Sequence, residues 1–373
     1  MKRVSLLLLA ILLTLSISAC QNKDVVICKV GNTEILRSEY ESVFNAYYQN
    51  AQYQYDMTNA DNLKALQDIV FDTLVRAEVI YQQALAQGYA LTADEEQQLI
   101  KDAQAQYDSV FSYYQSQAKD EGAEDVDAKA KELFKAALKD KGFTEKSLLE
   151  NIQRDMRKTA VAKQLEAAVK SEITFTEQDA QARFTQDVAA DRKTYTDTPA
   201  AFADAQGAFE SNGGVPPLYV PEGYMRVKHI LVADEATANQ LVERINAGED
   251  FDKLMAEFGT DPGMQSEPNK SLGYLMNKDT NFVPEFKEAA LKLMNVGDIT
   301  APVKTDYGYH IIKLVSKLTS GERSFSDVKD AYVEGMLAKL QTEHFRDKVT
   351  EWMNAASITK YEDRIRDLGQ AQQ

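Results

Sequence analysis

The sequence predicts an α+β protein of several domains, in which two helical stretches flank a middle domain of strands and helices. The chain has 373 residues, and at roughly 150 residues per domain this length predicts two or three domains. All eight prolines fall between Pro199 and Pro302, so the stretches on either side can form long uninterrupted helices. Apolar residues recur there at three- and four-residue steps. We therefore expect an all-α module built from both ends of the chain, with the middle domain inserted into it.

The N-terminus has the features of a cleaved secretion signal. Lys2 and Arg3 precede an apolar run that is followed by small residues, and the run is shorter than the roughly 20 residues of a membrane-spanning helix. Ile17-Ser18-Ala19-Cys20 resembles the bacterial lipobox, in which the cysteine becomes the first mature residue and carries lipid. A retained transmembrane anchor and a chance cysteine are the alternatives. We expect residues 1–19 to be removed and Cys20 to anchor the protein to the outer face of the cell membrane.

Composition argues against several kinds of site. The chain has 42 Lys+Arg against 58 Asp+Glu and a formal charge of −16, so we expect no nucleic-acid partner, because such binding depends on clustered basic residues. Two cysteines and three histidines are too few for the usual zinc sites, and we expect no metal. Lipid on Cys20 would leave Cys28 without a disulfide partner. We expect Cys28 to be a small core residue in a strand.

Residues 20–187 are expected to form the N-terminal part of the helical module. Val25 to Val30 has the composition of a short strand, with Gly31-Asn32 as its turn and Ser38 as the N-cap of a helix. Apolar residues from Asn62 to Ala86 recur with the period of a helix. The opening of this module is therefore predicted to be one strand followed by helices.

Local signals mark the ends of the next helices. Gly88 stands where a C′ glycine ends a helix, and Thr92 with Glu95 forms a capping box for the following one. The mixed charges from Lys119 to Lys141 predict a solvated segment, before another helix with apolar residues from Leu148 to Leu165. Seven tyrosines of this module either line a binding groove or, as is more common, pack one helix on another: Tyr47, Tyr48, Tyr53, Tyr55, Tyr107, Tyr113 and Tyr114.

Residues 188–222 are expected to be a linker. They contain four prolines and the Gly213-Gly214 pair, without a sustained period of either kind. From Ser324 onward the helical period returns, with an apolar face that needs a partner. The N-terminal helices are the only large surface of matching type, so residues 319–373 are expected to pack on them.

Residues 223–318 are expected to form a small α+β domain with helices around an antiparallel sheet. Gly248 and Gly259 end two of its helices. His229 and His310, two of the three histidines in the chain, lie in its first and last strands. A single histidine in a strand is usually structural, but these two occupy matching settings in one domain. The expected order is strand-helix-helix-strand-helix-strand-strand, and it includes Val227–Val232, Glu235–Asn246, Phe251–Phe258, Gly273-Tyr274, Pro284–Met294 and Gly308–Leu314.

Five short motifs follow one another in this domain: Gly248-Glu249-Asp250-Phe251, Leu272-Gly273, Gly297-Asp298-Ile299, Pro302-Val303-Lys304-Thr305 and Gly308-Tyr309-His310-Ile311-Ile312. In this order they resemble the parvulin family of peptidyl-prolyl isomerases, which pairs two histidines at the centre of its sheet. The resemblance implies that His229 and His310 are a catalytic pair with Thr305 as the neighbouring hydroxyl. It implies that Asp261 stands where parvulins carry a Cys or Asp facing the prolyl bond.

The same resemblance implies that Leu272, Phe282 and Phe286 form the apolar floor that receives the proline ring, while plain core packing is the alternative. Two features depart from the family. Asn269-Lys270-Ser271-Leu272-Gly273 replaces its Gly-Gly-Asp-Leu-Gly, and the loop after Asp261 is longer than usual. Parvulins that recognise phosphate carry a cluster of basic residues directly after the first strand. This chain has no such cluster there, so a preference for phosphoserine-proline is not expected.

The chemistry of prolyl isomerisation needs no cofactor, and we expect none. Rotation about an Xaa-Pro bond breaks amide resonance at a barrier near 20 kcal/mol. An apolar pocket can hold the proline ring while polar groups favour the twisted amide over the planar one.

The lipobox, the helical module and the inserted domain together resemble the PrsA-type extracytoplasmic foldases, with relatives among the SurA-type chaperones. This resemblance implies an isomerase and chaperone that binds unfolded secreted proteins with Xaa-Pro bonds. Two alternatives stay open. One is a holdase whose parvulin domain binds but barely turns over, which the altered glycine motif favours. The other is a surface lipoprotein that uses the fold only as a scaffold.

Overall fold

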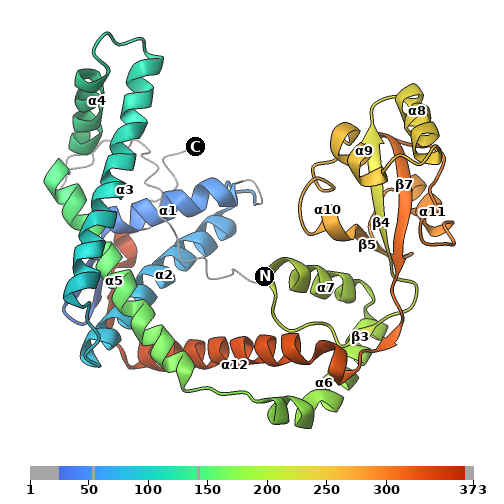
Figure 1. Cartoon of the computed structure of the whole chain (residues 1–373). Helices are drawn as coiled ribbons and strands as arrows, with labels where there is room; N and C mark the ends of the chain where they lie inside the picture. Colours follow the sequence, from blue (N-terminus) through green and yellow to red (C-terminus); the bar gives the residue numbers. More distant parts are fainter. Residues whose placement is uncertain (1–24, 53–54, 141–142, 366–373) are drawn as a thin grey trace. The chain divides into compact units, whose positions relative to one another are not determined.

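The computed structural model describes residues 25–52, 55–140 and 143–365 (Figure 1). The expected signal peptide, Cys20 and Tyr53 lie outside these ranges. The chain divides into two compact units, one made of residues 1–172 with 343–373 and the other of residues 173–342. In the described part of the chain, no helix combines the length and hydropathy needed to cross a bilayer.

The first unit combines the N-terminal helices with the C-terminal end of the chain. Its central strand β1 pairs with β2 on one side and with β9 on the other, both antiparallel. Elements far apart in the sequence therefore share one small sheet. The elements are β1 (Val26–Val30), β2 (Thr33–Leu36), α1 (Arg37–Ala51), α2 (Ala60–Ala86), α3 (Ala93–Asp120), α4 (Val126–Asp140), α5 (Glu145–Ser171), β9 (Ile358–Lys360), the short 3-10 helix η1 (Glu362–Arg364) and the C-terminal part of α12 (Phe325–Ala355).

Most local signals in this unit act as the sequence predicts. Thr92 and Glu95 form a reciprocal capping box at the start of α3, and Gly88 follows α2 with a φ of +85°. The expectation that Ser38 caps α1 is wrong. Leu36 holds the N-cap position, because its N–H donates to the Glu39 carboxylate at 3.0 Å while the N–H of Arg37 donates to the carbonyl of Val25.

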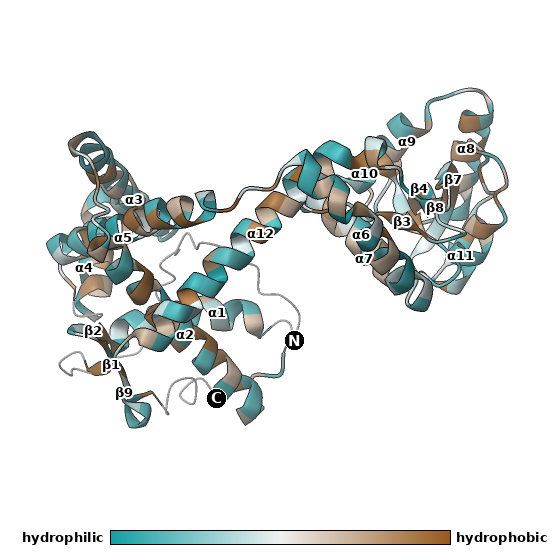
Figure 2. Cartoon of the chain, turned by 90° about the horizontal axis from the view of Figure 1, so that it is seen from below, coloured by the Kyte–Doolittle hydropathy of each residue, from teal (hydrophilic) through white to brown (hydrophobic). Residues whose placement is uncertain are grey.

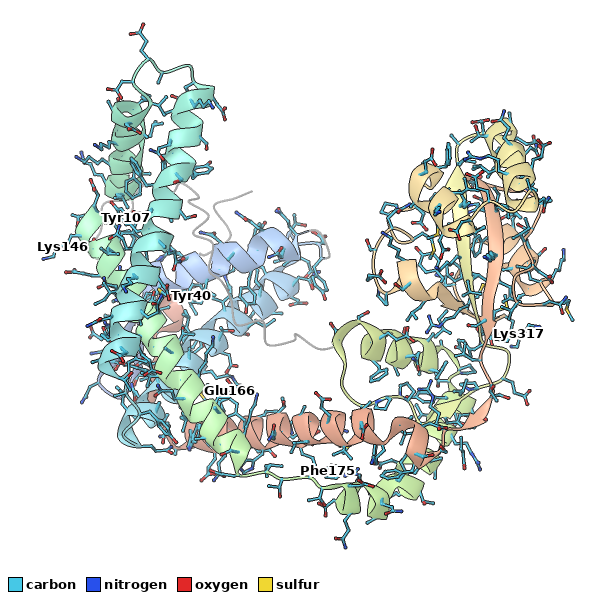
Figure 3. All side chains as sticks on the ribbon, in the orientation of Figure 1. Tyr40, Tyr107, Lys146, Glu166, Phe175 and Lys317 are labelled. Carbon is cyan, nitrogen blue, oxygen red and sulfur yellow. The ribbon has the colours of Figure 1, made fainter. Side chains whose placement is uncertain are left out.

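The stretch predicted to be a solvated separator contains a helix with a buried face. In α4, Ala130, Phe134 and Leu138 are buried against α3 and α5. The ring of Tyr107, which Figure 3 shows on α3, lies edge-on to Phe134 with the ring centroids 5.6 Å apart. Charged residues hid the period of α4 because they occupy its exposed face (Figure 2).

The tyrosines of this module divide by exposure. Tyr47 and Tyr48 pack against the core of α1 and α2, and Tyr107 and Tyr114 pack in the core of α3 to α5. Tyr55 and Tyr113 are 60% and 65% exposed. Helix packing, the more common alternative, accounts for four of the six described tyrosines.

The last helix contributes to both units. From Glu343 onward, α12 packs Phe345 and Trp352 near Val161 and Leu165 of α5, as the apolar face from Ser324 led us to expect. Its N-terminal part belongs to the second unit, where Tyr332 is fully buried. The boundary expected at residue 319 therefore differs from the division of the structure.

The expectation of an irregular linker over 188–222 is wrong in its secondary structure. Helix α6 (Glu177–Asp197) runs into this segment, and α7 (Ala200–Asn212) and the short strand β3 (Tyr219–Val220) follow. Phe202 of α7 is fully buried. The prolines misled the prediction because none of the four lies inside a helix: Pro199 is the N-cap of α7, and Pro216, Pro217 and Pro221 come after the helix has ended.

The rest of the second unit is built on a four-stranded antiparallel sheet with the order β5-β4-β7-β6. Helices α8 and α9 pack on one face around Ile230 and Ile311, and α11 packs on the other around Val227 and Ile312. The predicted element order is confirmed, with the short helix α10 in addition. The elements are β4 (Met225–Val232), α8 (Glu235–Asn246), α9 (Phe251–Phe258), α10 (Asn269–Leu272), β5 (Tyr274–Met276), α11 (Pro284–Leu291), β6 (Val303–Thr305), β7 (Gly308–Lys317) and β8 (Gly321–Glu322), which pairs with β3.

The buried thiol in β1 reports on the stability of the first unit. Cys28 is fully buried and free, and desolvation by that burial raises its pKa to about 11. In a chain that begins at Gln21, Cys28 is the only thiol. We predict that iodoacetamide labels it at pH 8 at least about a hundredfold more slowly in the native chain than in urea, since the thiolate is the reactive form. Equal rates, measured by mass spectrometry, would contradict the buried position of this strand.

Candidate functional site

The centre of the sheet brings the two strand histidines into contact. His229 of β4 and His310 of β7 lie on neighbouring strands, where His229 pairs with Ile312 and His310 pairs with Leu231. Their Nδ1 atoms are 2.9 Å apart, and the rings stack with centroids 5.1 Å apart. Both side chains are buried. The predicted imidazole pair is therefore present in the structure.

Asp261 joins this pair from the loop after α9. Its Oδ2 lies 2.7 Å from His229 Nε2, and its Oδ1 accepts the N–H of Gly263 at 2.9 Å. The hydrogen bond with His229 is the main reason that the pKa of Asp261 falls to about 2. The N–H of Thr260 donates to the carbonyl of Leu231 at 3.0 Å. This bond fixes the residue before Asp261 to β4, so the longer loop after Asp261 does not take the carboxylate away from the histidines.

Thr305 closes the other end of the line. Its Oγ1 lies 2.8 Å from His310 Nε2, and the N–H of Tyr307 donates to the same oxygen at 3.1 Å. Thr305 is the last residue of β6, next to the turn into β7, and it is buried. The four residues that the sequence assigns to catalysis thus form one continuous line of polar contacts.

With Asp261 ionised and both imidazoles neutral, one arrangement of protons satisfies this line. His229 Nε2–H donates to Asp261, so His229 Nδ1 must accept a hydrogen bond from His310 Nδ1–H. His310 Nε2 then accepts the Thr305 hydroxyl proton, and Thr305 accepts from the backbone of Tyr307. Every donor has one acceptor, and all protons point toward Asp261.

Burial keeps His310 neutral in this arrangement. Desolvation, together with a smaller effect of the neighbouring His229, lowers the pKa of His310 to about 4 against an opposing effect of Asp261. A charged His310 would also need a proton on Nε2, the atom that accepts the Thr305 hydroxyl proton in this arrangement. Asp261, which carries the ionised carboxylate, is more exposed than the histidine that it contacts.

The apolar residues implied by the resemblance are only partly brought together. Phe286 of α11 is 3% exposed, and its ring lies edge-on to His229 and His310 with centroids 5.2 and 5.3 Å apart. Phe282 lies next to it, with ring centroids 5.3 Å apart. Leu272, at the end of α10, is 38% exposed. Phe286 therefore supports the imidazoles from within the core, and Leu272 and Phe282 are the more accessible members of the set.

Sequence reasoning missed the role of Tyr274. Its hydroxyl donates to Asp261 Oδ2 at 2.9 Å, and its ring stands 5.6 Å from that of Phe282. Both desolvation and the bond to Asp261 raise the pKa of Tyr274. Gly263 makes room for this contact, since a Cβ there would lie 1.9 Å from the tyrosine hydroxyl. No local motif could reveal the contact, because 13 residues separate the two partners.

Comparisons with known proteins place these observations in context. One family model, the PPIC-type PPIASE domain, matches residues 232–316, and another, the SurA-like N-terminal domain, matches residues 3–124. The chain is 24% identical over 350 residues to the foldase protein PrsA of Clostridium acetobutylicum, covering 92% of this chain and 90% of that one. It is 30% identical over 232 residues to the foldase protein PrsA of Clostridium botulinum, covering 62% and 59%. The crystal structure of PrsA from Bacillus subtilis matches 94% of this chain and 99% of that one at 19% identity, with a TM-score of 0.30.

The neutral, buried His310 predicts a pH dependence of stability. Its pKa is about 4 in the folded chain against 6.5 ordinarily, so between these values the unfolded chain binds a proton that the folded chain does not. We predict that the free energy of unfolding falls by at most about 3 kcal/mol as the pH drops from about 6.5 to 4. Asp261, with a pKa of about 2, adds a further loss between about pH 4 and 2.

Urea unfolding at intervals of pH measures this loss, and His310→Gln removes the part above pH 4. Because the chain has only three histidines, NMR titration of their imidazole signals gives the pKa of His310 directly. A value near 6.5 for His310 would contradict the proposed proton arrangement.

Proposed function

Because the chain is a PrsA-type foldase with a parvulin-type peptidyl-prolyl isomerase domain, we propose that its catalytic centre consists of His229, His310, Thr305 and Asp261. The observation that carries this proposal is the unbroken line of contacts from Thr305 Oγ1 to the Asp261 carboxylate, buried at the centre of the sheet. Such a line holds one ionised carboxylate in a fixed position without a cofactor.

The chemical role of this centre follows from the charge distribution of an amide. In the planar amide, resonance places partial negative charge on the carbonyl oxygen, and the twisted amide loses that charge. A fixed carboxylate at Asp261 repels the planar form more than the twisted one, which lowers the barrier. The two imidazoles and Thr305 keep the carboxylate in place. Leu272 and Phe282, with Phe286 beneath, would hold the proline ring.

The protein acts outside the cytoplasm on unfolded proteins. We propose that its clients are secreted chains with Xaa-Pro bonds and that lipid on Cys20 holds it to the outer face of the cell membrane. The lipobox Ile17-Ser18-Ala19-Cys20 supports the anchor. Exposed Tyr55, between α1 and α2, and exposed Tyr113 of α3 offer apolar contact area for unfolded chains on the first unit.

Isomerase activity tests the catalytic assignment. In a chain of residues 21–373, we predict that Asp261→Ala and His310→Ala each lower kcat/KM on a non-phosphorylated Xaa-Pro peptide about 10- to 100-fold, because each breaks the line that fixes the carboxylate. His344→Ala is the matched control, since His344 is the remaining histidine and contacts Glu172 in the first unit. Its kcat/KM should equal that of the wild type.

A folded wild-type chain that accelerates exchange of no peptide would overturn the catalytic proposal. Suppression of aggregation of an unfolded client by the same chain would then identify it as a holdase. Unchanged activity in Asp261→Ala alone would remove only that residue from the centre.

The anchor is tested separately in cells. We predict that the wild-type protein incorporates radioactive palmitate and sediments with membranes, and that Cys20→Ser abolishes the label, since the thiol is the attachment point. Cys28→Ser is the control, because the Cys28 thiol is buried in β1. Labelling of Cys20→Ser at the wild-type level would refute the assignment.

A further inference from the structure

A buried ion pair connects α7 to the isomerase sheet. Arg226 of β4 and Glu210 of α7 bond through their side chains, which are only 10% and 12% exposed. Gln206 of α7 is also buried, donates to Glu210 and accepts from Arg323 at 2.8 Å. Removing one partner from such a pair leaves an uncompensated charge in the interior. The pair therefore fixes α7 and β4 relative to each other.

Aromatic packing holds α7 in the same place. Phe202 is fully buried, with its ring 4.7 Å from Tyr224 and 5.7 Å from Tyr195. The Tyr224 hydroxyl donates to the carbonyl of Pro199, at the start of α7, at 2.7 Å. Leu275 of β5 packs against this cluster. Helix α7 thus lies against the edge strand of the isomerase sheet, β5.

Arg226 uses its other nitrogen to hold the residue before Tyr274. Its Nη1 donates to the carbonyl of Gly273 at 3.0 Å. Gly273 has a φ of +82°, and a Cβ there would lie 2.8 Å from the carbonyl oxygen of Val227. Its own N–H donates to Asn269 at 2.7 Å. The backbone at Gly273 is therefore held from three sides at the point where β5 begins.

The next residue reaches the catalytic centre. Tyr274 pairs with Val227 in the sheet, and its hydroxyl donates to Asp261. A continuous set of bonds thus runs from Glu210 through Arg226, Gly273 and Tyr274 to the carboxylate.

We propose that Glu210 and Arg226 are positioning residues of the isomerase, which fix Asp261 through Gly273 and Tyr274, and that α7 is part of the working isomerase. The proposal rests on the proposed role of Asp261 in catalysis. It implies that residues outside 223–318 help to position Asp261, because a fragment with those limits would lack Glu210 and the packing surface of α7.

The test compares variants of the 21–373 chain by turnover, stability and the NMR signal of His229. We expect Glu210→Ala and Arg226→Met each to lower kcat/KM about tenfold, mainly in kcat, because a small displacement of a catalytic group has a large effect on rate. Tyr274→Phe, which removes only the bond to Asp261, should give a similar loss. All three should shift the His229 imidazole signal. Asp204→Ala, which removes an exposed carboxylate from the same helix, is the matched control. It should change neither kcat/KM nor the His229 imidazole signal.

The double variant separates positioning from stability. Glu210→Ala removes the carboxylate beside Arg226 and Arg323, so it should lower the thermal midpoint, and adding Arg226→Met should restore part of that loss because one of the two buried positive charges is then gone. Turnover should stay low, since Arg226→Met removes the bond to Gly273. Recovery of turnover together with stability would overturn the proposal and leave the pair with a structural role.

Failure of the proposed function would look different. If the wild-type chain turns over no peptide, the His229 signal alone decides: a shift in Glu210→Ala and Tyr274→Phe, but not in Asp204→Ala, supports the positioning role. A His229 signal that is the same in Glu210→Ala and Asp204→Ala overturns it, whether or not the wild type is active.

Discussion

The contact between the Nδ1 atoms of His229 and His310 constrains the isomerase sheet. These two buried nitrogens are 2.9 Å apart and share one proton, so one ring donates and the other accepts. The roles of the two Nε2 atoms follow from this. Asp261 must accept on one side and Thr305 must donate on the other. The register of β4 and β7 cannot slip by one residue, because either histidine would then face α8 and α9 instead of α11.

The carboxylate at the end of this line needs support from outside the loop that carries it. Gly263 and Tyr274 supply two hydrogen bonds to Asp261 in addition to that of His229. Tyr274 lies at the start of the edge strand β5, which has a sheet neighbour on only one side. An edge strand with three residues is held weakly by its own ladder. The contacts of Arg226 with Gly273, and of α7 with β5, supply the restraint that a second neighbouring strand would give.

In the first unit, the C-terminal end of the chain completes both the small sheet and the helical core. β1 has β2 on one side and β9, from the far end of the sequence, on the other. Phe345 and Trp352 of α12 complete the core that Val161 and Leu165 of α5 begin. The N-terminal helices alone would leave these apolar surfaces open to water. The middle of the chain can therefore be an insertion, because the two ends meet in one core.

The sequence by itself determined the features that depend on neighbours within a few residues. The capping box of Thr92 and Glu95, the helix ends at Gly88, Gly248 and Gly259, and the strands that carry His229 and His310 all follow from local patterns. The four residues proposed for catalysis were identified through the family resemblance of ordered motifs, although their contacts join three strands and a loop.

The tertiary structure alone decided which distant polar groups meet. The prolines around α7, all of them outside the helix, obscured it in the sequence, and the charged residues of α4 concealed the apolar face of that helix. In the sequence, Tyr274 and Arg226 have no feature that separates them from ordinary strand residues. The partner of Tyr274 is Asp261, 13 residues away, and the partner of Arg226 is Glu210 of α7. A buried hydrogen bond between distant residues forms only where two chain segments lie side by side. Which segments become neighbours is decided by the packing of whole helices and strands, and the sequence pattern within either segment does not specify it.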